Sequence, residues 1–259
     1  MNQQRQIAVV INTYNAERHL KRVLESVKGF DEILVCDMES TDNTLSIARQ
    51  YGCRIVTFPK DKHTIVEPAR EFAIHQAQCE WVLVVDADEL VTPQLKDFLY
   101  QEIAKTDCPD GIAIPRKNYF MGQFLHSAYP DYVLRFFRRD KTHWPPVIHC
   151  SPVVEGTVER IPKSRKELAL THLANDTVSD ILRKSDTYSN YEMARRRHKG
   201  YGLWALFARP TFRFFKSYCL KRGFLDGKVG LIHALLDATY QFAIVAKLIE
   251  EKNNKRKER

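Results

Sequence analysis

The stretch that decides the fold is Trp81–Glu89, WVLVVDADE, in which five apolar residues lead directly into three carboxylates. A wholly apolar run of this length predicts a strand at the centre of a parallel sheet. Ligands of open α/β sheets bind beyond the carboxyl ends of the strands, so we expect Asp86 and Asp88 at a ligand site. Two carboxylates on one turn can converge on a hard cation such as Mg²⁺ or Mn²⁺. The alternative is that they only cap the next helix.

The chain before this stretch alternates short apolar runs with amphipathic segments, which is typical of a parallel sheet flanked by helices. We expect strands at 7–11, 33–36, 54–58 and 81–85, with helices at 20–27, 44–51 and 68–78 between them. A helix from Pro93, a short β segment at 111–115 and a strand at 133–137 follow, within a loosely patterned region from 116 to 162. The last part predicts three helices, at 177–198, 204–221 and 228–251.

Polar residues also follow the first two predicted strands. Asp37 ends the second strand, where a carboxylate can accept hydrogen bonds from a ribose or base, or can serve only as a turn residue. Thr13 ends the first strand just before a helix. Arg70, near the start of its helix, can meet a base or diphosphate or be solvated. If the strands are adjacent, Thr13, Asp37 and Asp86 lie on one rim of the sheet.

Composition narrows the class of protein. The chain has 259 residues, 44% hydrophobic and 28% charged, which suits one large α/β domain or one domain with a helical appendage. The net charge of +8 indicates an anionic partner, which includes nucleic acid, an acidic membrane or a phosphorylated substrate, or else serves solubility. Six cysteines without a CxxC pair indicate a reduced, cytosolic protein. The polar N-terminus and the lack of 18 consecutive apolar residues lead us to expect no secretory signal and no spanning helix.

Three N-terminal segments together resemble glycosyltransferase family 2: Val9–Asn15, Asp31–Asp37 with Ser40–Thr44, and Asp86–Glu89. Four later segments resemble a narrower branch, the lipopolysaccharide-core glycosyltransferases related to heptose glucosyltransferases: Asn118–Gly122, Tyr129–Asp131, Leu134–Phe137 and Gly223–Gly227. The resemblance spans nearly the whole chain. It implies the GT-A fold, a three-layer α/β sandwich, here with a helical C-terminal appendage, and a mostly inverting chemistry.

The resemblance also implies roles on the donor side. The residues that hold the nucleotide are Thr13, Tyr14, Glu17, Asp37 and Arg70. Asp86 contacts the ribose or sugar, and Asp88 binds Mg²⁺ or Mn²⁺ through the donor diphosphate. His172 is a candidate further metal ligand, and its alternative is a histidine hydrogen-bonded in a turn.

The acceptor side departs from the branch in one place. The branch usually has a His-Glu pair where this chain has His149-Cys150, and a thiol is a poor substitute for a carboxylate base. Asp131 is therefore the first candidate for the catalytic base and Glu155 the second. The residues assigned to acceptor binding are Tyr119, Tyr129, Arg135 and His149, although aromatic residues in such loops are as often structural.

The predicted protein is an inverting, metal-dependent enzyme that moves glucose or another hexose from a nucleotide-diphosphate donor to a lipopolysaccharide-core or other cell-envelope glycan acceptor. Its expected divisions are 1–115, the nucleotide-sugar-binding half, 116–176, the acceptor-binding half, and 177–259, the helical appendage. The basic, aromatic helices of the appendage are expected to lie peripherally on the inner face of the cytoplasmic membrane, or to pack on the catalytic domain or a second subunit.

Two rival functions are disfavoured. A metal-dependent sugar-phosphate nucleotidyltransferase normally needs a glycine-rich basic loop after the first strand, where this chain has Asn12–Glu17, NTYNAE. A nucleic-acid binder is suggested by the run Arg195–Arg197, but no recognised binding module surrounds it.

Overall fold

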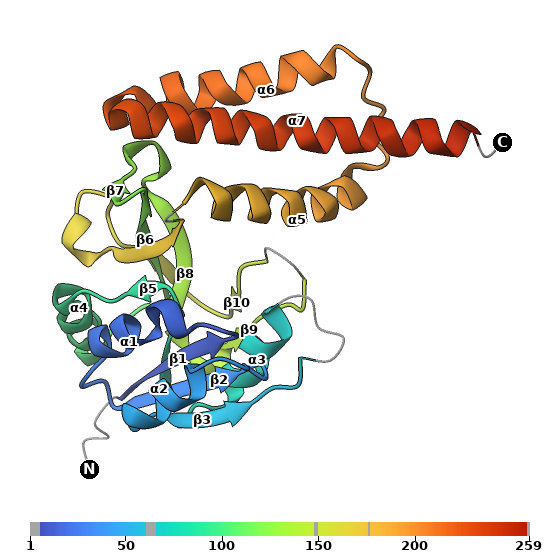
Figure 1. Cartoon of the computed structure of the whole chain (residues 1–259). Helices are drawn as coiled ribbons and strands as arrows, with labels where there is room; N and C mark the ends of the chain where they lie inside the picture. Colours follow the sequence, from blue (N-terminus) through green and yellow to red (C-terminus); the bar gives the residue numbers. More distant parts are fainter. Residues whose placement is uncertain (1–5, 61–65, 148–149, 176, 258–259) are drawn as a thin grey trace. The chain divides into compact units, whose positions relative to one another are not determined.

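The computed structural model describes residues 6–60, 66–147, 150–175 and 177–257 (Figure 1). The chain forms two compact units, which are described separately. Unit 1 holds Met1–Lys117 and Pro130–Leu173, and unit 2 holds Asn118–Tyr129 and Ala174–Arg259. The predicted α/β class is confirmed, because parallel strands alternate with helices in the first part and helices dominate the last.

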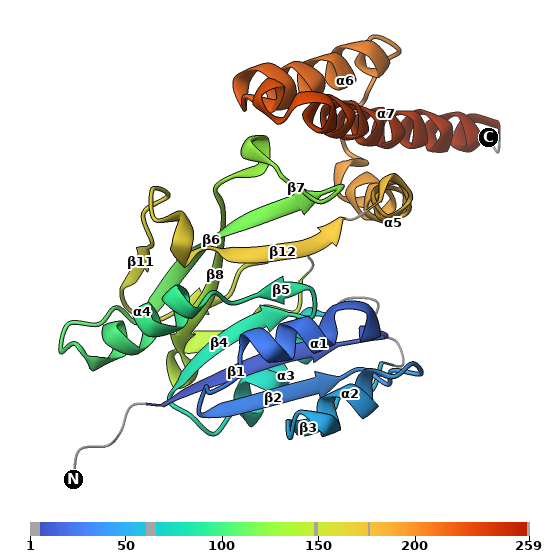
Figure 2. The ribbon, with the colours of Figure 1, turned by 60° about the vertical axis from the view of Figure 1, so that its left-hand side comes forward.

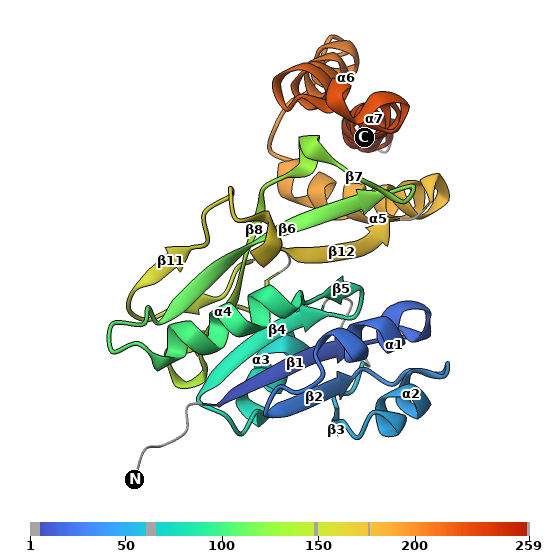
Figure 3. The same cartoon turned by 90° about the vertical axis from the view of Figure 1, so that its left-hand side faces the viewer.

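Unit 1 is built on four parallel strands in the order β3-β2-β1-β4 (Figure 3). They are β1 (Ile7–Thr13), β2 (Glu32–Asp37), β3 (Arg54–Thr57) and β4 (Trp81–Asp86). The predicted strands lie where expected, and three of them extend far enough to include Thr13, Asp37 and Asp86. Thr13 pairs with Asp37 and Asn12 with Asp86, so the expected adjacency of these strand ends is confirmed.

Beyond β4 the sheet becomes mostly antiparallel, although β11 pairs in parallel with β6. β8 (Asp131–Arg138) pairs with β4, and β6 (Gly111–Phe120) pairs with β8. The path continues to β12 (Leu170–Asn175) and β5 (Glu89–Leu90), while β7 (Gln123–Phe124) and β11 (Val158–Arg160) pair with β6. β9 (Thr142–His143) and β10 (Val153–Val154) form a separate pair. The expectation of a β segment ending at residue 115 is wrong, because pairing with β8 and β7 extends β6 to Phe120.

Helices cover both faces of the parallel strands. α1 (Glu17–Ser26), α2 (Thr44–Gln50) and α4 (Pro93–Ala104) pack on the face that carries Ile7, Val9 and Ile11. α3 (Glu67–Gln76) packs on the opposite face, which carries Ala8 and Val10. Figure 2 shows α1 and α3 on opposite sides of β1 and β2. Side chains alternate along a strand, so β1 contributes to both cores and is buried throughout. The three-layer arrangement is thereby confirmed.

Unit 2 contains three long helices: α5 (Val178–Arg196), α6 (Ala205–Phe215) and α7 (Gly227–Lys257). α6 continues into a π-helical turn, Lys216–Leu220, and a 3₁₀ turn, η5 (Gly223–Asp226), precedes α7. α7 packs against both other helices (Figure 1). Lys247 of α7 bonds Asp186 of α5 at 2.7 Å, and Asp237 of α7 lies 3.3 Å from Arg213 of α6.

The segment Gly223–Lys255 is long and apolar enough to cross a membrane by length and composition alone, and 28% of its most apolar window is buried. Core helices of soluble proteins pass the same test. The absence of 18 consecutive apolar residues therefore did not exclude such a helix, because scattered polar residues interrupt α7 without making it polar.

Candidate functional site

The carboxylate of Asp86 is held between two arginines from different elements. Nη2 of Arg70, on α3, lies 2.5 Å from Oδ1, and Nη2 of Arg135, on β8, lies 2.5 Å from Oδ2. Both guanidiniums also lie against the ring of buried Trp144, at 4.9 and 5.5 Å from its centroid. Burial opposes ionisation of Asp86, but the charges of Arg135 and Arg70 outweigh it and hold the pKa of this carboxyl below its usual value.

A second series of linked polar contacts begins at the same end of β4. The backbone N–H of Asp86 donates to Oε2 of Glu89 at 3.0 Å, and Glu89 is fully buried. Arg116 bridges Glu89 at 2.9 Å and Oδ2 of Asp131, to which its Nη2 and Nε donate at 2.7 and 3.0 Å. Burial opposes the charge of Arg116, and the two carboxylates still raise the pKa of Arg116.

Glu89 and Arg116 were given no role by the sequence. Glu89 had a signal, because it completes the acidic run that begins at Asp86. Arg116 had none, because its partners are set by the pairing of β6 with β8, in which Arg116 lies opposite Asp131.

The predicted nucleotide residues lie at the ends of β1 and β2 and in the turns that follow. The Asp37 carboxylate is buried and accepts bonds from Thr13 Oγ1 at 2.9 Å, from Ser40 Oγ at 2.6 Å and from the Ser40 N–H at 2.9 Å. Tyr14 is exposed, and Nζ of Lys60 lies 3.2 Å from its ring centroid. Lys60 therefore covers one face of the Tyr14 ring, and the Asp37 contacts suit a turn residue as well as a ribose ligand.

The two turns are also bonded to each other. Glu17 accepts from the backbone N–H and the side-chain amide of Asn43, at 3.0 and 2.8 Å. Asn15, with φ of +47°, accepts from the N–H of Thr41 at 2.8 Å. The left-handed backbone at Asn15 is one that asparagine tolerates better than most residues. The rim is thus built by side chains before any ligand arrives.

Asp88 lies in the turn between β4 and β5, and His172 lies in β12, which pairs with β5. Nε2 of His172 is 3.7 Å from Oδ1 of Asp88, and the Leu173 N–H donates to the Asp88 backbone oxygen at 2.9 Å. His172 belongs to β12 and pairs with Glu89, so the alternative of a histidine in a turn is wrong. Burial is the largest cause that lowers the pKa of His172, and Arg116 adds to it. A neutral imidazole is the form that binds metal ions.

The structure's described part contains no group of three or more His, Cys, Asp or Glu side chains placed to hold a metal ion. Asp88 and His172 supply two ligands of suitable chemistry. Mg²⁺ and Mn²⁺ sites commonly combine one or two protein ligands with substrate phosphates and water. The pair therefore fits a cation that is completed by a diphosphate, and not one held by protein alone.

The predicted acceptor and base residues are dispersed. Arg135 bonds Asp86, as described above. Tyr119 and Tyr129 belong to unit 2, where both rings pack on Phe124, at centroid distances of 6.1 and 5.7 Å. Glu155 is exposed after β10, and His149 lies outside the described residues.

The sequence model of the family described as "Glycosyl transferase family 2" matches residues 8–154. An uncharacterized glycosyltransferase of Rickettsia typhi, RT0209, is 26% identical over 95% of this chain and 87% of its own length. The lipopolysaccharide core biosynthesis glycosyltransferase LpsC of Rhizobium meliloti is 24% identical over 94% of this chain and 92% of its own.

Two solved structures share the fold. The mannosyltransferase PcManGT from Pyrobaculum calidifontis, in complex with GDP-Man and Mn²⁺, has a TM-score of 0.56 at 13% identity and covers 97% of this chain and 89% of its own. S. aureus TarS 1–349 has a TM-score of 0.50 at 15% identity, with coverage of 95% and 92%. These likenesses confirm the expected GT-A sandwich.

Removing the charge of Asp86 is predicted to destabilise the protein. Asp86→Asn keeps the side-chain shape but leaves two poorly solvated guanidiniums without a counter-charge, which typically costs about 3–5 kcal/mol. Urea unfolding at pH 7 measures the change in the free energy of unfolding. Asp97→Asn, at an exposed position on α4, is the matched control and is expected to change it by less than about 0.5 kcal/mol. Equal effects of the two substitutions would contradict the ion-pair interpretation.

The contribution of Asp86 is also predicted to depend on pH in one direction. Because its pKa is lower in the folded chain, the stabilisation is fully present above the unfolded value of about 4 and is lost as the pH falls toward the folded value. The difference in unfolding free energy between wild type and Asp86→Asn is expected to stay constant from pH 8 to 6 and to shrink below about pH 4. A difference that grows on acidification would refute this sign.

Proposed function

The chain belongs to glycosyl transferase family 2, and we propose that it moves glucose or another hexose from a nucleotide-diphosphate donor to a lipopolysaccharide-core or other cell-envelope glycan. The acceptor class is supported by the named relative LpsC, which matches over 92% of its own length. The observation that carries the reaction type is the rim of the sheet. There Asp86, Asp88 and His172 lie together with Arg70 and Arg135.

On the donor side, Asp88 and His172 are proposed to hold Mg²⁺ or Mn²⁺. Such a cation, when bound, neutralises charge that develops on a leaving diphosphate. Arg70 is proposed to meet the diphosphate or base, because its guanidinium stands at the same strand end. The proposed nucleotide contacts are Thr13, Tyr14, Glu17, Asp37 and, toward the ribose or sugar, Asp86.

On the acceptor side, we propose a single displacement with inversion at the anomeric carbon. The bond from the acceptor oxygen to that carbon forms as the bond from the carbon to the diphosphate oxygen breaks, and the hydroxyl proton passes to a carboxylate. Asp131 is the first candidate, because Arg116 fixes its orientation through two bonds to Oδ2. Glu155 is the second. Arg135, Tyr119, Tyr129 and His149 are the proposed acceptor contacts.

Loss of the Asp88 carboxylate is predicted to abolish transfer while the protein stays folded. Asp88→Asn removes the proposed anionic cation ligand, and a loss of several kcal/mol of charge stabilisation corresponds to at least about a hundredfold in rate. The assay measures release of nucleoside diphosphate from UDP- or GDP-hexoses with deacylated lipopolysaccharide core oligosaccharide and Mn²⁺.

The control for this assay is Asp107→Asn, at an exposed turn, with thermal unfolding used to confirm that both variants fold. Full activity of Asp88→Asn, or of the wild type in excess chelator, would contradict the metal role. Formation of a nucleoside triphosphate and a hexose 1-phosphate from the same nucleotide sugar, when pyrophosphate replaces the oligosaccharide, would indicate the alternative reaction, sugar-phosphate nucleotidyl transfer run in reverse.

We further propose that unit 2 associates peripherally with an anionic membrane surface on its cytoplasmic side. Large apolar side chains are exposed on α6 and at its N-cap: Trp204 is 79%, Phe207 69% and Phe212 62% exposed. Large apolar side chains that are exposed together on one helix are typical of interaction sites. The cations Lys216, Lys221 and Arg222 are exposed in the same stretch, as is typical of helices that lie in a lipid interface.

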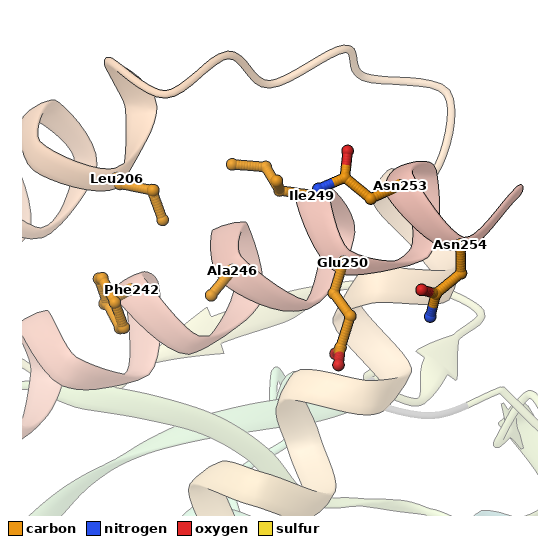
Figure 4. Close-up of a pocket in the computed structure, with 7 residues that line it drawn as sticks. All are labelled: Leu206, Phe242, Ala246, Ile249, Glu250, Asn253 and Asn254. Carbon is orange, nitrogen blue, oxygen red and sulfur yellow. The ribbon is translucent and has the colours of Figure 1, made fainter. Parts of the chain in front are cut away.

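A hollow between α6 and α7 lies in the same unit (Figure 4). Its volume is about 380 Å³, and its apolar lining consists of Leu206, Phe242, Ala246 and Ile249. Glu250, Asn253 and Asn254 line its polar end. Figure 4 shows Leu206 on the α6 side and the other lining side chains along α7. An apolar hollow beside exposed aromatic residues supports a lipid-facing surface.

Removing the exposed aromatics is predicted to weaken membrane binding. The double substitution Trp204→Ser with Phe207→Ser is expected to abolish sedimentation with phosphatidylglycerol vesicles at low salt, because the apolar area available for insertion is lost. Val158→Ser, exposed on unit 1, serves as the control and is expected to leave binding unchanged. A wild type that ignores anionic vesicles, or a dimer that the same double substitution dissociates in sedimentation velocity, would overturn this proposal.

A further inference from the structure

A buried carboxylate in unit 2 holds one histidine in a defined orientation. Asp226, in η5, has a fully buried side chain. Its Oδ1 accepts from the backbone N–H of His126 at 2.8 Å and pairs with the Nδ1 of the same residue at 2.7 Å. Its Oδ2 accepts from the N–H of Ser127 at 3.1 Å. Two segments 100 residues apart therefore meet at this one side chain.

The local sequence is built around this contact. A Cβ on Gly230 would come within 2.0 Å of the Gly223 backbone oxygen and 2.7 Å of the Asp226 Cβ, so only glycine lets η5 pack against α7. Gly227, at φ of +57°, supplies the turn between them. The side-chain amide of Gln123 also donates to the backbone oxygen of Asp226 at 3.2 Å. The segment Gly223–Gly227, for which the sequence analysis predicted no role, thus holds Asp226 in place.

The partners of Asp226 decide which nitrogen of His126 carries the proton. Burial opposes ionisation of Asp226, but the amides of His126 and Ser127 lower the pKa of this carboxyl, so it is an acceptor only. Nδ1 of His126 must then be the donor, and in the neutral ring Nε2 presents a lone pair. The side chain is 47% exposed, and Nε2 has no hydrogen-bond partner among the residues that the structure describes.

Aromatic side chains surround this imidazole. The ring of Phe124 meets that of His126 edge on, with centroids 4.9 Å apart. Tyr119 and Tyr129 pack on the same Phe124, and all three aromatic residues are partly exposed. Ligand sites commonly combine such apolar faces with a few well-placed polar groups. Nε2 of His126 is an oriented hydrogen-bond acceptor beside the partly exposed rings of Phe124, Tyr119 and Tyr129. This combination suits a sugar, because a sugar hydroxyl can donate to Nε2 while an apolar face of the sugar stacks on a ring.

We propose that His126 binds the glycan acceptor by accepting a hydrogen bond from one of its hydroxyls at Nε2, with Asp226 as the positioning residue. This inference rests on the proposed function, since it assigns the acceptor side of the same reaction.

The first test is kinetic. With deacylated lipopolysaccharide core oligosaccharide as the probe, His126→Ala is expected to raise the acceptor KM about tenfold, the loss expected for one hydrogen bond. The KM of the nucleotide sugar is expected to stay within about twofold. His126→Gln, which keeps an acceptor atom within reach, is expected to restore most of the affinity. His198→Ala, an exposed histidine of the same unit, is the matched control.

Asp226→Asn tests the positioning role. The amide removes the negative charge beside Nδ1, and in either orientation its NH2 group faces a backbone N–H that the carboxylate accepted, so the ring loses its fixed orientation and the acceptor KM is expected to rise as in His126→Ala. An unchanged acceptor KM in His126→Ala, or an equal rise in His198→Ala, would overturn the inference, and neither result depends on whether Asp226→Asn folds.

The second test does not require turnover. In ¹⁵N-histidine-labelled wild type, the Nε2 resonance of His126, identified by its absence in His126→Ala, is expected to shift when the oligosaccharide is added without donor. An unperturbed resonance at saturating oligosaccharide overturns the inference. If the resonance shifts but no nucleotide sugar is consumed, the binding site stands and the proposed transfer reaction is the part that fails.

Discussion

The ion pairs of Asp86 with Arg70 and Arg135 join parts of unit 1 that the chain brings in separately. Asp86 ends the last parallel strand, Arg70 comes from α3 on one face, and Arg135 comes from the first antiparallel strand. Glu89, Arg116 and Asp131 extend the same alternation of charge across β6 and β8. The rim at the carboxyl ends of the parallel strands therefore depends on electrostatic contacts that fix the antiparallel strands beside the parallel ones. The carboxylates of Asp86, Glu89 and Asp131 balance the charges of three arginines. This balance explains how six charged groups can lie close together where most of them are shielded from water.

The parallel half could be predicted from the sequence because its information is local. Apolar runs such as Trp81–Val85 mark buried strands, and the polar residue after each run marks the carboxyl end. In the antiparallel half the apolar segments at 111–115 and 133–137 were also predicted, but Arg116–Phe120 was not, because it has no apolar pattern of its own and becomes a strand only through pairing with β8 and β7. The same reason explains why the contact of Arg135 with Asp86 was not predicted, since the register between strands decides which charge an arginine meets.

In unit 2 the sequence identified the helices but not their faces. The amphipathic pattern placed α5, α6 and α7 correctly, yet it could not say that Lys247 would bond α5 or that Trp204 would remain exposed. Those outcomes depend on which helix packs on which. The segment Gly223–Gly227 shows the same limit, because its resemblance to other sequences marked it without indicating that Asp226 would meet His126.

The turns that follow β1 and β2 are bonded to each other, by Glu17 with Asn43 and by Asn15 with Thr41. These bonds have a thermodynamic consequence for ligand binding. Loops that are ordered only by a ligand subtract their conformational entropy from its affinity. Here folding itself has already restricted both backbones, and the left-handed Asn15 is fixed by its own side chain. A ligand that binds at this rim therefore meets a surface with little disorder left to remove, so more of its contact energy is available as affinity.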